Sequence, residues 1–61
     1  MFKVSFSYKS KPKKIKVMNE DDLIKIVGSF IVDKAKKDGQ SKVVIINKGE
    51  SINCEVKFRP N

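Results

Sequence analysis

Apolar and polar side chains alternate strictly along two segments of the chain, residues 2–9 and residues 52–59. A period of two is typical of a β-strand with one apolar and one solvent-exposed face. A shorter segment around Ile15 and Val17 alternates in the same way, with lysines between its apolar residues. Pro12 interrupts the pattern before it, because proline cannot donate to a strand ladder. The segments on either side of Pro12 therefore predict a β-hairpin.

Residues 20–38 have helical periodicity instead. Their apolar positions recur every three or four residues, which predicts one apolar stripe along a helix. Asn19 precedes the segment as a favourable N-cap, three acidic residues follow in the first turn, and Gly39 is placed for a left-handed C-terminal cap. The prediction is one continuous helix. The residues of its expected stripe are Leu23, Ile24, Val27, Phe30, Ile31 and Ala35.

A further strand is predicted over residues 42–47, where four β-branched residues follow one another. The element order is then ββαββ. We expect an α+β fold in which a four-stranded, mainly antiparallel sheet carries one helix packed on one face. The helix would be a right-handed crossover between two parallel strands, either the second and third or the first and fourth.

The chain has 61 residues, which predicts a single small basic domain over residues 1–61. A chain of this size buries only about 60% of its unfolded surface, so self-association is one route to added stability. Cys54 is the only cysteine and there is no histidine, which argues against an internal disulfide, a metal cluster or a cofactor. The sequence shows no secretory signal and no membrane-spanning apolar run, so we expect a cytoplasmic protein without a membrane partner.

Basic residues outnumber acidic residues by 14 to 7, and the net charge is +7. A surface of one sign attracts partners of the opposite sign, so nucleic acid or an acidic protein surface is the expected partner. Two groups of cations are candidates for this contact: a hairpin arm, and the sheet face opposite the helix, where Glu55 is the one expected acid. The arm contains Lys9, Lys11, Lys13 and Lys14, and the sheet face contains Lys3, Lys14, Lys16, Lys57 and Arg59.

With its lysines and serines, this sheet face resembles in outline the nucleic-acid platform of small RNA-binding folds, in which exposed aromatic rings stack on bases. Here the alternation places the aromatic residues Phe2, Phe6, Tyr8 and Phe58 on the inward face. All the basic residues except Arg59 are lysine, which acts as a point charge, whereas arginine reads guanine edges. We therefore expect contacts to phosphates, with little dependence on base sequence.

Some apolar residues do not fit a single helix-covered core. In the strand over residues 42–47, either Val43 with Ile45 or Val44 with Ile46 must point away from the helix. Val32 also lies off the predicted helical stripe. Exposed apolar residues of this kind favour contact with a second subunit or another protein. The candidate self-association residues are Val44, Ile46 and Val32.

No arrangement of nucleophile, base or metal ligands is recognisable, so we expect a protein that is not an enzyme. The leading hypothesis is a small non-enzymatic protein that binds nucleic acid through backbone phosphates, as a monomer or a homodimer. The first alternative is a protein-binding module or inhibitor, of the type that phages and mobile elements encode, which docks on an acidic protein surface. The basic first strand of this chain is similar to that of some ubiquitin-like interaction modules. The second alternative is a self-assembling structural protein.

Overall fold

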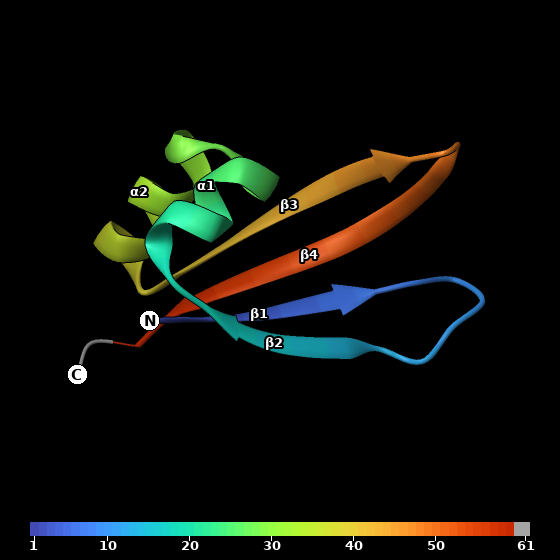
Figure 1. Ribbon diagram of the computed structural model, residues 1–61, viewed down its shortest axis with the longest axis horizontal. Helices are drawn as coiled ribbons and strands as arrows, with labels where there is room; N and C mark the ends of the chain where they lie inside the picture. The colour runs from blue at the N-terminus through green and yellow to red at the C-terminus, as the bar shows by residue number, and fades with distance from the viewer. Residues whose placement is uncertain (60–61) are drawn as a thin grey trace.

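The first and last strands of the chain lie side by side in the centre of one antiparallel sheet. The computed structural model describes residues 1–59 (Figure 1). Its elements are β1 (Phe2–Ser7), β2 (Lys14–Met18), α1 (Glu20–Val27), α2 (Ser29–Asp38), β3 (Gln40–Asn47) and β4 (Glu50–Phe58). The strand order is β2-β1-β4-β3, which confirms an α+β fold with a four-stranded antiparallel sheet. The prediction of a parallel pair of strands is wrong, because every neighbouring pair is antiparallel and β2 and β3 lie at opposite edges.

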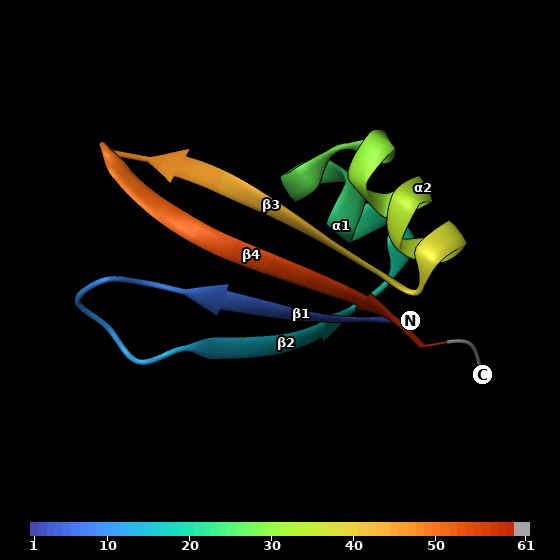
Figure 2. The same ribbon diagram turned by 180° about the vertical axis from the view of Figure 1, so that it is seen from behind.

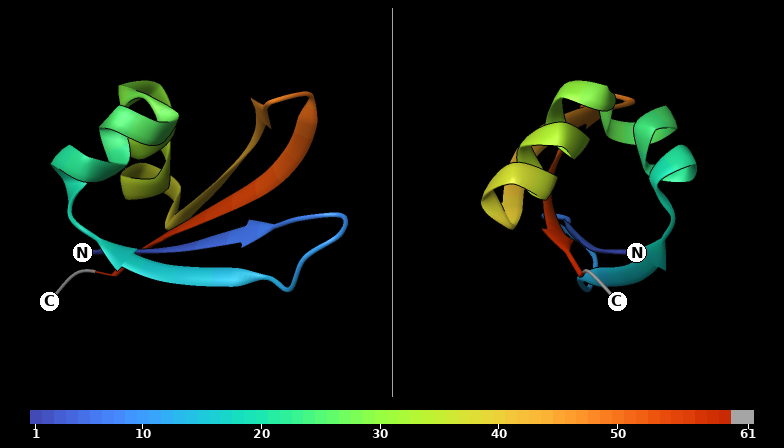
Figure 3. Two further views of the ribbon diagram at one scale, coloured as in Figure 1. Left: turned by 45° about the vertical axis from the view of Figure 1, so that its right-hand side comes forward. Right: turned by 90° about the vertical axis from the view of Figure 1, so that its left-hand side faces the viewer.

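Residues 20–38 form two helices rather than the one predicted. Gly28 separates α1 from α2 with a φ of +88° and a ψ of 160°, a conformation almost restricted to glycine. The outer caps are as predicted: the Asp22 amide donates to the Asn19 side-chain oxygen over 2.9 Å, and Gly39 is left-handed. A straight helix of this length would span roughly 28 Å. The break instead folds α1 against α2 over one end of the sheet (Figure 3).

The break also changes which helical residues are buried. Leu23, Val32 and Ala35 are fully buried, whereas Phe30, which the periodicity places in the apolar stripe, is 76% exposed. Because α2 starts afresh after Gly28, it does not continue the stripe of α1, and Val32 packs into the core. The prediction that Val32 belongs to a self-association surface is therefore wrong.

Neither helix of the described residues is long and apolar enough to cross a membrane.

The core lies between the helices and the central strands. Phe2 and Val4 of β1 pack with Cys54 and Val56 of β4, and each of the four is at most 2% exposed. The rings of Phe2 and Phe58 add an aromatic contact with 5.2 Å between their centroids. Residues directly opposite in this register share a face of the sheet, and this face is covered by the helices. The other face, which carries no helix, is called the open face below.

The two faces of strand β2 are exchanged relative to the prediction. Lys14 pairs with Phe6, so Lys14 and Lys16 lie on the helix side of the sheet, and Ile15 and Val17 lie on the open face. These two apolar residues are 55% and 64% exposed. Alternation in an edge strand shows only that its two faces differ, and a shift of one residue exchanges them. The length of the connection over residues 8–13 decides the observed register.

Both hairpins extend beyond the helices. Their turns lie at the end of the molecule away from α1 and α2, and the two hairpins diverge toward these turns (Figures 1 and 2). The β3–β4 turn contains Lys48 and Gly49, with φ values of +52° and +79°, as a tight two-residue hairpin connection requires. In the β1–β2 hairpin, residues 9–17 are all exposed.

Replacing Gly28 with alanine tests the break between the helices. A Cβ at this position meets no atom within 4 Å, so only the backbone conformation opposes the change. We expect Gly28→Ala to lower the free energy of unfolding by about 1–3 kcal/mol. In a continuous helix the same change would raise it by about 1 kcal/mol. Urea unfolding followed by circular dichroism distinguishes the two signs, and Ser29→Ala is the control, with an expected change within about 0.5 kcal/mol.

Candidate nucleic-acid interface

The positive charge of the chain is concentrated in its first hairpin. Residues 1–19, which include β1, β2 and their connection, contain six lysines and no acidic residue. Residues 20–38, which form the helices, contain five acidic residues and four lysines and are close to neutral. Five of the six hairpin lysines lie in residues 8–16, called the cationic hairpin below. These five are Lys9, Lys11, Lys13, Lys14 and Lys16.

The cationic hairpin presents lysines on both of its sides. Lys14 and Lys16 lie on the helix side of β2, as its register with β1 shows. Lys13 instead lines a hollow on the open face. Lys9 and Lys11 are exposed in the connection between the strands. The structure therefore brings the predicted arm together, but it moves Lys14 and Lys16 away from the other cations predicted for the open face.

Tyr8 lies among these lysines and is not part of the buried core that the inward-facing aromatic residues were expected to form. It follows the last residue of β1 and is half-buried. The Nζ atoms of Lys11 and Lys14 are 5.7 and 6.0 Å from the centre of its ring. A cation within about 6 Å of an aromatic face is attracted to it. The ring of Tyr8 therefore makes favourable contacts with two lysines of the cationic hairpin, which strand alternation did not reveal.

The open face does not form the continuous cationic surface that the sequence predicts. Lys3 and Lys57 are directly opposite each other, an arrangement of like charges that is destabilising. Glu55 offsets it, because its carboxylate lies 3.7 Å from the Lys57 Nζ and 3.8 Å from the Lys42 Nζ. Lys42 was not among the predicted residues, although its position directly opposite Glu55 in the β3–β4 register makes it part of this cluster. At the β2 edge of this face, two apolar residues stand where lysines were predicted.

A hollow of about 450 Å³ occupies the middle of the open face. Its walls combine polar residues with apolar ones, namely Ser5, Ser7, Lys13, Lys42, Asn53 and Glu55 with Val43, Val44 and Cys54. The Glu55 carboxylate would repel a phosphate group placed in this hollow, and its two lysine neighbours are already engaged with it. The hollow is therefore a weaker candidate for binding phosphate than the exposed hairpin.

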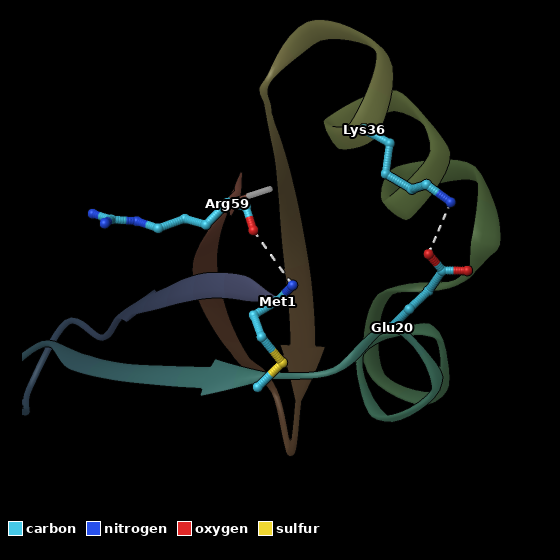
Figure 4. A network of polar contacts seen from close by, with 4 residues as sticks. All are labelled: Met1, Glu20, Lys36 and Arg59. Carbon is cyan, nitrogen blue, oxygen red and sulfur yellow. Dashed lines mark hydrogen bonds and ion pairs between the residues drawn. The ribbon is translucent and has the colours of Figure 1, made fainter. Parts of the chain in front are cut away.

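Arg59 belongs to a second, smaller group of cations at the other end of the sheet. Its amide donates to the Met1 carbonyl over 3.0 Å, and the Met1 ammonium donates to the Arg59 carbonyl over 3.5 Å. The guanidinium points away from the helices (Figure 4). Lys3 and Lys57 lie at the same end of the sheet, two residues along the chain from Met1 and Arg59. The predicted cations therefore still form two groups, but Lys14 and Lys16 are separated from the second group, which keeps Lys3, Lys57 and Arg59.

The helices offer less available charge. Lys36 of α2 donates to the Glu20 carboxylate of α1 over 2.9 Å, which is a solvent-exposed contact between the two helices (Figure 4). This hydrogen bond, with the negative charge of Glu20, raises the pKa of Lys36. Acidic side chains accompany the remaining helical lysines in the sequence. A polyanion that approaches the helices meets charges of both signs.

The buried thiol of Cys54 is not suited to chemistry. Cys54 is 2% exposed, and burial raises its pKa above the usual range for a thiol, which disfavours the reactive thiolate. Among residues 1–59, no group of three or more His, Cys, Asp or Glu side chains is arranged to hold a metal ion. The cationic hairpin is thus the most distinctive chemical feature of the described chain.

No protein-family model matches the chain, and comparison with curated proteins and with solved structures finds no significant match.

The reactivity of Cys54 tests its position in the core. Reaction at pH 8 with a disulfide reagent requires local opening of the sheet, so we expect the folded protein to react about tenfold more slowly for each 1.4 kcal/mol of opening free energy. Urea should abolish the protection. The control is the double variant Asn53→Cys, Cys54→Ala, whose thiol lies on the open face and should react at once. Equal rates for the two folded proteins would contradict the assigned faces of β4.

Burial of this thiol also predicts a pH dependence of stability. Because the folded pKa of Cys54 is raised, the unfolded chain loses its thiol proton at a lower pH than the folded chain. The contribution of the buried thiol to stability is fully present below the ordinary thiol pKa and is lost as the pH rises through the raised value. We expect Cys54→Ala to remove this alkaline decline, which urea unfolding at several pH values would measure.

Proposed function

We propose that this protein binds nucleic acid through backbone phosphates, without catalysis, and that the cationic hairpin is its main contact surface. The observation that carries the proposal is the separation of charge along the chain. The hairpin strands and their connection contain six lysines and no acidic residue, whereas the helices are close to neutral. A hairpin of this kind is exposed along residues 9–17 and contains no carboxylate of its own that would repel a polyanion.

The physical basis is the release of counterions. A nucleic acid carries a condensed layer of cations, and each lysine that neutralises a phosphate releases some of them. Lysine ammonium groups act as point charges that tolerate many phosphate geometries, so this binding depends little on base sequence. At physiological salt, such non-specific binding has a dissociation constant of roughly 10⁻⁴ to 10⁻⁶ M. Tyr8 adds one aromatic ring to the hairpin, next to Lys11 and Lys14.

The second group of cations makes a smaller contribution in this proposal. Lys57 is 3.7 Å from the Glu55 carboxylate, which reduces its attraction for phosphate. Lys3 and Arg59 lie near it at the end of the sheet that carries the helices. They would contact a long nucleic acid that runs along the sheet from the hairpin, but not a short one bound at the hairpin turn.

A pair of charge-matched triple variants tests the proposal. The hairpin variant replaces Lys9, Lys11 and Lys13 with glutamine. The helix variant replaces Lys25, Lys34 and Lys37 with glutamine, so each variant loses three positive charges. Binding to a fluorescent DNA duplex is measured across a salt series. We expect the hairpin variant to lower the slope of log K against log salt by about 0.9 for each phosphate that it no longer neutralises, while the helix variant keeps most of the slope. Equal effects of the two variants would show that net charge alone governs binding.

Inorganic polyphosphate separates phosphate contacts from base contacts. Tyr8 is the only tyrosine and the chain has no tryptophan, so intrinsic fluorescence reports on the hairpin alone. We expect polyphosphate to change this fluorescence and to compete with duplex DNA. If neither DNA nor polyphosphate binds at low salt, the proposal is wrong, and an acidic protein surface becomes the partner to seek.

A further inference from the structure

The open face carries excess positive charge at the end of the sheet near the helices. Lys3 of β1 lies between Val17 of β2 and Lys57 of β4, because it pairs with both in the sheet register. Like charges directly opposite each other in neighbouring strands destabilise a sheet. Glu55 offsets this repulsion only in part, since its carboxylate is shared between Lys57 and Lys42. A bound anion would remove the remaining repulsion.

A second hollow, of about 280 Å³, lies beside these cations. Its lining combines apolar residues with two cations, namely Met1, Phe2 and Val17 with Lys3 and Arg59. Met1 and Val17 are 51% and 64% exposed, so their apolar surface is open to a ligand. Among residues 1–59, no acidic residue lines this hollow, whereas Glu55 is part of the wall of the larger one. The smaller hollow therefore offers an anion both positive charge and an apolar surface.

The chemistry of this lining indicates the class of ligand. The guanidinium of Arg59 can hold a phosphate through two hydrogen bonds, and Lys3 adds a second positive charge. The exposed side chains of Met1 and Val17 suit a group with an apolar surface. Pockets that enclose a whole small molecule measure roughly 300 to 1,000 Å³, so this hollow suits only part of a ligand. One nucleotide of a single strand has both parts, because its phosphate is charged and the face of its unpaired base is free.

We propose that Met1, Lys3, Val17 and Arg59 form a nucleotide site, which binds one unpaired nucleotide of a single-stranded nucleic acid. The phosphate lies between Lys3 and Arg59, and the base lies against Met1 and Val17. This inference rests on the proposed function, because the cationic hairpin supplies the main attraction for the same strand. The site and the hairpin lie at opposite ends of β1, roughly 20 Å apart, so a strand of about ten nucleotides reaches both.

A strand without bases is the most direct probe of this site. Two fluorescent oligonucleotides of equal length are compared, one of thymidines and one in which every base is replaced by an abasic site. Both have the same phosphates, so contacts to phosphate alone give equal affinities. We expect the protein to bind the thymidine strand about three- to tenfold more tightly, because only this strand has a group for the apolar surface. Equal affinities would overturn the proposal.

Two uncharged substitutions on β2 test where the base lies. Val17→Ser and Ile15→Ser each remove an exposed apolar side chain from the open face, but only Val17 lines the hollow. We expect Val17→Ser to bring the affinities for the two strands close together, whereas Ile15→Ser keeps the preference for the thymidine strand. Equal loss of the preference in both variants would contradict the assigned position of the base. Circular dichroism checks that each variant is folded.

A charge-matched pair of double variants tests where the phosphate lies. The test variant is Lys3→Gln with Arg59→Gln, and the control is Lys34→Gln with Lys37→Gln, which removes the same charge from α2. We expect the test variant to weaken binding of the thymidine strand several-fold more than the control does, because it removes a direct phosphate contact. Equal weakening by the two variants would show that only the net charge matters at this end of the sheet.

Duplex DNA separates this inference from the proposed function. Its bases are paired, so Val17→Ser should leave duplex binding unchanged. Replacing Lys9, Lys11 and Lys13 with glutamine should weaken binding of both the duplex and the single strand. If binding depends on the hairpin but not on the base or on Val17, the nucleotide site alone is overturned. If it depends on Val17 and the base but not on the hairpin, the hairpin is overturned as the main contact. Absence of binding to every strand would overturn both.

Discussion

The rest of the structure depends on the antiparallel pairing of β1 with β4. This pairing joins residues at opposite ends of the sequence, so the chain loses the entropy of closing a long loop before any contact can compensate. The compensation comes from Phe2 and Val4, which are buried against Cys54 and Val56 beneath the two helices. Because β1 and β4 occupy the centre, β2 and β3 must be the edges. Each edge strand is then attached to the molecule through one neighbour and extends with its hairpin beyond the helices.

The two edges differ in their chemistry. On one side, the cationic hairpin combines exposed lysines with a single tyrosine ring and no carboxylate. On the other, β3 is nearly neutral and presents Val44 and Ile46 to solvent. The first carries the positive charge that the proposed function requires, and the second carries exposed apolar side chains.

The sequence predicts the elements well because capping residues, periodicity and turns agree locally, as at Asn19 and Gly39. It does not predict two features that depend on tertiary packing. Gly28 fits a helical pattern in the sequence, whereas its φ of +88°, the burial of Val32 and the exposure of Phe30 show that α2 starts anew. For β2, alternation defines two faces but does not say which one points to the core. The same distinction applies to the candidate site. The density of lysines in the sequence predicts the hairpin arm. The predicted cationic surface on the open face does not form, because the register of β2 places Lys14 and Lys16 on the helix side.

The central claim is that a polyanion binds mainly at the cationic hairpin and not at every positive charge on the surface. Backbone amide NMR spectra recorded while a short DNA duplex is added test it most directly, because they report on each residue separately. We expect the largest shifts in residues 8–16, with smaller ones near Lys3 and Arg59 and little change in α2. Shifts spread evenly over all lysines, or largest along the helices, would contradict the claim.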